Sequence, residues 1–140
     1  MNYWLFKSEP NTWSWDDQLK AGENGEVWDG VRNYQACNNM KIMRIGDLGF
    51  FYHSVSEKRI VGIVKIIKEY HPDPTDKKGK FGMVSVKAVK TLDKAVSLSE
   101  IKSNQKLADF IMLRQNRLSV LPVNEDQWEI ICHMANLKTS

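Results

Sequence analysis

The chain has 140 residues, of which 42% are hydrophobic and 26% charged, and its formal net charge is +3. This length predicts a single domain over residues 1–140 with a full core, and the balanced composition excludes a disordered, collagen-like or coiled-coil chain. The mild positive charge permits contact with phosphates without requiring it.

No apolar run approaches the roughly 18 residues of a membrane span, and the first residues lack the pattern of a secretory signal. We therefore expect a soluble, cytoplasmic protein without membrane contact, or a nuclear one if its source is a eukaryote. Cys37 and Cys132 lie far apart and have no partners at metal-ligand spacing. We expect both to be free thiols, and we expect a monomer with no metal and no cofactor.

The first half of the chain predicts a strand, two helices and a hairpin. Ser14 and Asp17 form a capping-box pattern that opens a helix, and Gly22 suits the position just past its end. The expected elements are, in order, a strand over 3–7, a helix that opens at Ser14 and ends before Gly22, a loop over 22–30, a helix over 34–43 and antiparallel strands over 47–55 and 59–68.

The second half predicts strands and helices without regular alternation. Ser97 with Glu100 opens one helix, and Asn124 caps another. The expected elements are an exposed connection over 70–82, a strand over 83–90, a helix from 97 to 112 broken near Asn104, a strand over 118–123 and a final helix. This order favours an α+β fold, and short aromatic strands suit a small barrel.

Aromatic residues are concentrated near the N-terminus, where ten of the fourteen lie within the first 52 positions. A core of that segment requires fewer, so we expect some of them to line a pocket. Polar residues accompany them in the segments 7–10, 28–36 and 50–54, and a fourth polar group occupies 114–120. If strand ends converge at one mouth of a barrel, these segments face one cavity.

Several of these residues have two interpretations. Trp28 is either a core ring or a stacking wall, and Asn33 is either a helix cap or a ligand contact. Arg32 and Tyr34 suit the binding of a flat heterocycle. His53 and Ser54 are adjacent on a strand and point to opposite faces, so a nucleophilic pair is disfavoured and a structural or ligand-contact histidine is expected.

Positive charge is expected at two further places. Arg117 and Ser119 alternate with the aliphatic residues of a predicted strand, which would put both on one face beside the pocket. Lys77, Lys78 and Lys80 lie in the polar connection and would at most hold phosphates without reading sequence. The three histidines have no metal-site spacing, and no phosphate-binding glycine loop is present.

The chain also resembles a known family. The segments YWLFKSEP, WDGVRNYQA, GDLGFFYHS, GIVKI, YHPDPT and RLSV occur in the order and spacing of the EVE domain. The resemblance spans about residues 3 to 131 and implies a PUA-like fold, a small bent β-barrel with helices packed around it. It departs at Cys37, where members commonly carry Arg, and in VSVKAV at 84–89.

The resemblance implies a binding module that recognises a modified nucleobase in DNA or RNA, with no catalytic activity. An enzyme acting on a small heterocycle or nucleoside, and a shape-selective module in RNA processing or translation, remain alternatives. The ligand-binding positions that it implies are Lys7, Ser8, Glu9, Trp28, Gly30, Val31, Arg32, Asn33, Tyr34, Tyr52, His53, Ser54, Arg117, Leu118 and Ser119.

Overall fold

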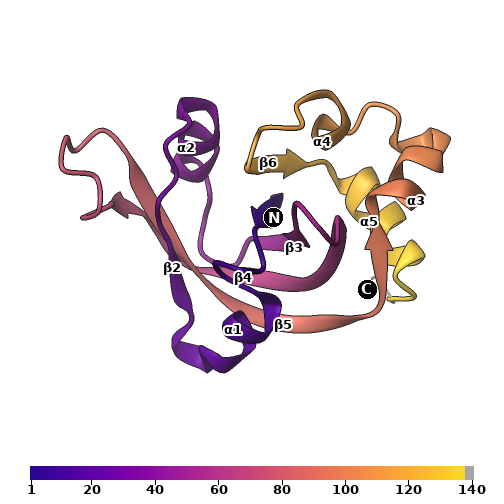
Figure 1. Cartoon of the computed structure of the whole chain (residues 1–140), viewed down its shortest axis with the longest axis horizontal. Coiled ribbons are helices and arrows are strands. Elements are labelled where there is room, and N and C mark those ends of the chain that lie inside the picture. Colours follow the sequence, from indigo (N-terminus) through magenta and orange to yellow (C-terminus); the bar gives the residue numbers. More distant parts are fainter. Residues whose placement is uncertain (138–140) are drawn as a thin grey trace.

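The computed structural model describes residues 1–137 and contains one mixed six-stranded sheet of order β2-β5-β4-β3-β1-β6 (Figure 1). Only the β1–β3 pair is parallel among these neighbours. The strands are β1 (Tyr3–Ser8), β2 (Glu26–Trp28), β3 (Leu48–His53), β4 (Arg59–Pro72), β5 (Gly82–Ser97) and β6 (Val120–Val123). The helices are α1 (Trp15–Lys20), α2 (Tyr34–Lys41), α3 (Leu98–Ser103), α4 (Ile111–Arg114) and α5 (Glu125–Met134), with short 3-10 turns η1 (Gly22–Asn24) and η2 (Gln105–Leu107).

Helix starts follow the capping residues of the sequence. Ser14, Ser97 and Asn124 each accept a hydrogen bond from the backbone N–H three residues on, and each capping box is complete. Such caps satisfy donors that the first helical turn would otherwise leave free. Asn104 interrupts the third predicted helix, as expected, because it caps η2 instead.

The α+β class and the strongly bent sheet are confirmed (Figure 1). The long strands β4 and β5 curve through several register shifts, which bend a strand and increase its twist. The barrel does not close by strand pairing, because β2 and β6 stay as the two edges within the described residues. A free edge at β2 is the feature that shapes the candidate site.

The structure corrects three expected boundaries. Part of the loop expected over 22–30 forms β2, which pairs with β5 far along the chain. The strands β4 and β5 extend well beyond 59–68 and 83–90, because their polar ends are paired with each other. The last strand begins at Val120, so Arg117 and Ser119 lie before it in a turn and a bend.

Aromatic packing joins the sheet to its helices. Trp128 of α5 stacks on Phe50 with ring centroids 4.0 Å apart and on Tyr3 at 4.4 Å. Gly62 of β4 lets the Trp15 ring of α1 lie directly on the strand, since any side chain there would collide with that ring. Most of the aromatic residues therefore belong to the core.

Within residues 1–137, the two cysteines, Cys37 and Cys132, are free and buried. No helix in this part of the chain is long and apolar enough to cross a membrane. No group of three or more potential metal-ligating side chains gathers among these residues.

Candidate nucleic-acid binding site

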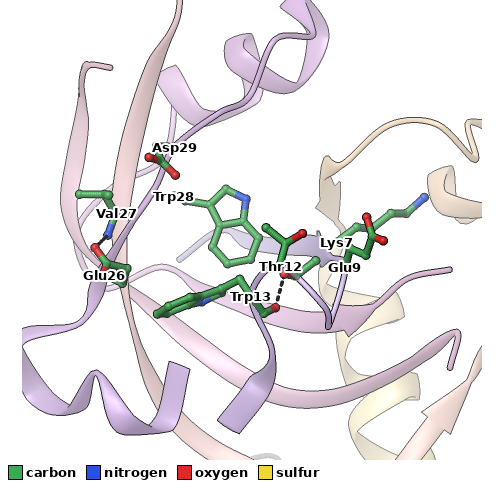
Figure 2. A pocket seen from close by; sticks show the side chains of 9 residues that line it. Lys7, Glu9, Thr12, Trp13, Glu26, Val27, Trp28 and Asp29 are labelled. Carbon is green, nitrogen blue, oxygen red and sulfur yellow. Dashed lines mark hydrogen bonds between the residues drawn. The ribbon is translucent and has the colours of Figure 1, made fainter. Parts of the chain in front are cut away.

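A cavity of about 530 Å³ opens between the end of β1 and the free edge of β2 (Figure 2). Trp13 and Trp28 lie at its centre, with Glu26 and Asp29 on one side and Lys7 and Glu9 on the other. Its lining residues come from β1, the following loop, and β2 with its next residue: Lys7, Ser8, Glu9, Thr12, Trp13, Glu26, Val27, Trp28 and Asp29. We call this space the first cavity.

Trp28 forms the inner wall of the first cavity. The residue is 9% exposed, and its ring makes edge contacts with Phe6 and Phe51 at centroid distances of 5.0 and 5.6 Å. Its Nε1–H finds no acceptor within residues 1–137, and neither does that of Trp128, whereas the indole N–H groups of Trp4, Trp13 and Trp15 donate hydrogen bonds. A nearly buried indole donor usually has a partner, so Trp28 presents a rigid ring with a donor left for a ligand.

The loop after β1 is held by a chain of hydrogen bonds. The Ser8 hydroxyl donates to the backbone carbonyl of Trp13, and Trp13 Nε1 donates to Gln18 Oε1 at 2.9 Å. Gln18 is fully buried and donates in turn to the Val86 carbonyl of β5 at 3.2 Å. The Trp13 wall is therefore fixed to the sheet before any ligand arrives.

The free edge of β2 turns main-chain groups outward at Val27. Ile66 of β4 donates its N–H to the Asp47 carbonyl on the β3 side, so it faces away from β5. Its β5 partner Val86 must then direct its own N–H and C=O to β2, where it pairs with Glu26. Val27 comes next and alternates, so its N–H and C=O point away from β5.

The side chain of Glu26 already binds one of these main-chain groups, the Val27 N–H. Val27 N–H donates to the carboxylate of Glu26 at 2.9 Å (Figure 2). The carbonyl of Val27 accepts no hydrogen bond within the described residues, so a donor and an acceptor of the edge both lie at the cavity wall. A ligand that takes the N–H must displace the carboxylate.

The first cavity carries net negative charge. Glu9, Glu26 and Asp29 line it, against the single cation Lys7. The Lys7 side chain runs away from Trp28, and its ammonium donates to the Asn116 carbonyl at 3.0 Å (Figure 2). Partial burial lowers the pKa of Lys7. Carboxylates next to an aromatic wall suit a flat ligand that offers N–H donors, such as an amino-bearing base.

A second, smaller cavity of about 350 Å³ lies on the other side of Lys7. It contains the predicted residues Tyr52 and Ser54 together with Lys7. Six of the predicted site residues line these two neighbouring cavities and the other nine line neither, so the expectation of one shared cavity is wrong.

His53 has a structural role in this arrangement. Its Nε2 accepts the backbone N–H of Trp15 at 3.0 Å, and its Nδ1 lies 3.2 Å from the Glu57 carboxylate. Accepting at Nε2 assigns the ring proton to Nδ1, opposite that carboxylate. The proximity of His53 lowers the pKa of Glu57. Nε2 thus holds the start of α1, whereas the buried Nδ1 faces the Glu57 carboxylate without an aligned hydrogen bond among the described residues.

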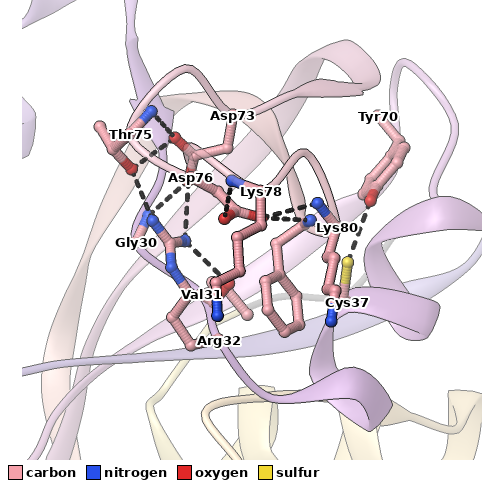
Figure 3. A network of polar contacts seen from close by, with 11 residues as sticks. Gly30, Val31, Arg32, Cys37, Tyr70, Asp73, Thr75, Asp76, Lys78 and Lys80 are labelled. Carbon is pink, nitrogen blue, oxygen red and sulfur yellow. Dashed lines mark hydrogen bonds and ion pairs between the residues drawn. The ribbon is translucent and has the colours of Figure 1, made fainter.

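The predicted segment Gly30–Tyr34 is clamped to the loop between β4 and β5 (Figure 3). Asp73 accepts from Gly30 N–H at 2.9 Å, from the Arg32 guanidinium at 3.2 Å and from the Thr75 hydroxyl at 2.6 Å. Its side chain is fully buried. Burial favours the neutral acid, but these hydrogen bonds outweigh it and lower the pKa of Asp73 to about 2.

The remaining residues of that segment lie outside both cavities. Asn33 caps α2 by accepting the Ala36 N–H, and Val31 is buried in the core. Tyr34 is 61% exposed and packs against Phe81, with ring centroids 4.9 Å apart. The expectation that Tyr34 and Trp28 border one pocket is therefore wrong, because α2 carries Tyr34 to the outer face.

Residues 117–119 and the lysines of the loop between β4 and β5 lie outside both cavities. Arg117 is exposed and Leu118 buried, and only the Ser119 carbonyl touches β1, where it accepts the Lys7 N–H at 2.8 Å. None of these three residues lines either cavity. Lys77, Lys78 and Lys80 lie on the surface in a loop that Asp76 organises by accepting backbone N–H groups of Lys78 and Lys80.

The sequence missed five residues of the first cavity: Thr12, Trp13, Glu26, Val27 and Asp29. Position near the motifs was the available signal, since Thr12 and Trp13 follow KSEP after one residue, Glu26 and Val27 precede WDG, and Asp29 lies within it. Lys7, Ser8, Glu9 and Trp28 are brought together as expected.

A model of the EVE domain matches residues 2–134. The chain belongs to the EVE domain family. Thymocyte nuclear protein 1 of Gallus gallus is 35% identical over 169 aligned positions, which cover 97% of this chain and 69% of that relative.

Solved structures agree with this EVE domain over its whole length. A protein of Agrobacterium tumefaciens superposes with a TM-score of 0.97 and 47% identity, covering 100% of this chain and 97% of that one. The human THYN1 protein, solved in complex with 5-methylcytosine-containing DNA, superposes with a TM-score of 0.91 and 29% identity, covering 99% of this chain and 100% of that one.

Proposed function

We propose that this EVE domain is a binding module that holds a modified nucleobase of DNA or RNA in the first cavity. The observation that carries the proposal is the rigid Trp28 ring with a free N–H, set beside the free edge of β2. The human THYN1 structure with 5-methylcytosine-containing DNA supports the same ligand class.

The mechanism requires an unpaired base. A base inside a duplex shows only its groove edges, so it must be extruded or single-stranded, at a cost of a few kcal/mol for extrusion. Contact with an aromatic wall returns about 1–3 kcal/mol. The exposed edge of the base then meets the Trp28 N–H, the Val27 main chain and the carboxylates of Glu9 and Asp29, which favour amino-bearing bases.

We propose binding rather than catalysis because the histidine among the predicted site residues is engaged within the protein. The predicted site residue His53 uses Nε2 to accept the Trp15 N–H, and its Nδ1 is buried against Glu57, so neither ring nitrogen reaches the first cavity. A general base needs a nitrogen or oxygen free to reach the ligand. Turnover of nucleosides by the purified protein would contradict this part of the proposal.

Trp28→Phe tests the proposed site, because it keeps an aromatic ring and removes the indole N–H and part of the wall. We expect it to weaken binding of a single-stranded DNA with one 5-methylcytosine about tenfold, by loss of one donor and some stacking area. Binding of the unmodified DNA should weaken less. Fluorescence anisotropy with labelled DNA measures both affinities.

Trp15→Phe is the matched control, since Trp15 is also a buried tryptophan but does not line the first cavity. Tyr34→Ala controls for an exposed aromatic ring. Circular dichroism and thermal unfolding verify that each variant is folded. Equal losses on modified and unmodified DNA, or a Trp15→Phe loss as large as that of Trp28→Phe, would contradict the proposed site.

A further inference from the structure

The second cavity is cationic, in contrast to the first. Three lysines, Lys7, Lys58 and Lys102, line it together with Ser54 and Asn116, and its lining includes no carboxylate. The two cavities share Lys7, so they are neighbours. Figure 2 shows the Lys7 ammonium at the end of its side chain, away from Trp28.

These lysines lack acidic partners within residues 1–137. The ion pairs of this part of the chain use other cations, such as Lys87 with Glu23 and Arg32 with Asp73. The single hydrogen bond of the Lys7 ammonium goes to a neutral carbonyl, that of Asn116. A neutral acceptor leaves the positive charge uncompensated, and grouped cations of this kind favour an anion.

A buried tyrosine hydroxyl also indicates that the second cavity favours an anion. Tyr52 is 4% exposed, yet its hydroxyl has no hydrogen-bond partner among the described residues. It is also not one of the fully enclosed unpaired groups, so it reaches the cavity. A register shift between Phe51 and Tyr52 accompanies this placement, and bulges of this kind re-aim side chains. Burial raises the pKa of Tyr52, so the hydroxyl stays protonated and able to donate.

The hairpin between β3 and β4 presents Lys58 in a constrained conformation. Val55 and Lys58 have φ angles of 70° and 51°, which non-glycine residues adopt at a cost. The Lys58 carbonyl accepts the Leu98 N–H at 2.8 Å, which fixes this turn to the start of α3. The turn therefore holds the Lys58 side chain at the rim of the cavity.

We propose that the second cavity binds a phosphate group, that of the nucleic-acid backbone next to the base held in the first cavity. The inference rests on the proposed function for its polymer, and on the lysines and Tyr52 for its chemistry. Lysines contact phosphates as point charges, and the Tyr52 and Ser54 hydroxyls supply directed donors. The shared Lys7 places base and backbone on opposite sides of one side chain.

The test compares two double variants that remove the same charge. Lys58→Gln/Lys102→Gln alters the second cavity, and Lys68→Gln/Lys90→Gln alters exposed lysines of β4 and β5 that line neither cavity. Affinity for single-stranded DNA with one 5-methylcytosine is measured at several salt concentrations. We expect the first variant to reduce the slope of log affinity against log salt by about 1.4, for two single-strand phosphate contacts, and the second to leave it unchanged.

Tyr52→Phe removes one hydroxyl that makes no hydrogen bond to any residue of 1–137. We expect about fivefold weaker DNA binding, the worth of one hydrogen bond, with an unchanged midpoint of unfolding. Equal salt slopes for the two double variants, together with wild-type affinity of Tyr52→Phe, would overturn the inference.

Nuclear magnetic resonance separates this inference from the proposed function. If the DNA moves the Trp28 indole signal but not the Ser54 and Lys58 amides, the proposed function stands and the phosphate site is wrong. If the DNA moves neither, the proposed function fails, and titration with inorganic phosphate alone decides the second cavity. Shifts of Ser54 and Lys58 with phosphate, absent in Lys58→Gln/Lys102→Gln, would then support an anion site for free phosphate, and no shifts would overturn it.

Discussion

At the residue scale, Glu26 blocks the main-chain donor at the free edge of β2, because its carboxylate accepts the Val27 N–H. Glu26→Gln removes the charge but keeps an oxygen for this bond, whereas Glu26→Ala removes both. We expect DNA affinity to rise in both variants and to be about three- to fivefold higher for Glu26→Ala than for Glu26→Gln, the worth of one freed donor.

Anisotropy titrations of the same DNA measure this order of affinities, and amide hydrogen exchange at Val27 reports whether its N–H has been freed. Equal affinities of the two variants would show that the bond to Glu26 does not compete with the ligand. Weaker binding by both would show that Glu26 contacts the base itself.

Residues chosen from the sequence were correct where their role is local. Asn33 was expected as either a cap or a ligand contact, and the Ala36 N–H decides for the cap. Trp28 was expected as either a core ring or a stacking wall; it packs against Phe6 and Phe51 and also lines the first cavity, and its stacking on a ligand stays a prediction. The free Trp28 donor depends on the absence of a distant acceptor, which no local pattern reveals.

At the element scale, Asp73 ties the segment after β2 to the loop between β4 and β5 (Figure 3). Its pKa is lowered from the ordinary 3.8 to about 2, so its contribution to stability is fully present above pH 3.8 and lost as the pH falls through about 2. We expect Asp73→Asn to lower the free energy of unfolding by about 2 kcal/mol near neutral pH.

Urea unfolding from about pH 7 down to about pH 2 measures this difference, which should shrink as the pH falls below 3.8. Asp93→Asn, at an exposed position of β5, is the matched control and should leave stability nearly unchanged. An Asp73→Asn effect independent of pH would mean that its charge does not stabilise the clamp.

Elements were predictable from the sequence where the signal lies within a few residues. The caps at Ser14, Ser97 and Asn124 placed three helices, and turn composition placed the β3–β4 hairpin. The strand β2 has three residues and exists through its pairing with β5, some 58 positions further on. Such a short edge strand has no periodicity of its own, so tertiary pairing alone identifies it.

At the scale of the whole molecule, the bent and unclosed sheet sets an acidic aromatic cavity beside a basic one. The sequence and the family resemblance predicted the bent α+β fold, and they selected Lys7 and Trp28, which both line the first cavity. The division into two cavities could not be predicted, because it depends on the direction of the Lys7 side chain and on the bulge at Tyr52.

Whether a modified base enters the first cavity is tested most directly by the tryptophan indole signals in an NMR titration with the 5-methylcytosine DNA. Trp4 and Trp15 donate to Asp47 and Thr91 away from the first cavity, whereas the Trp28 donor is free. We expect a large shift of the Trp28 indole N–H signal, smaller with unmodified DNA, while the Trp4 and Trp15 signals stay in place. A Trp28 signal that does not move while the DNA is bound would contradict entry of the base into the first cavity.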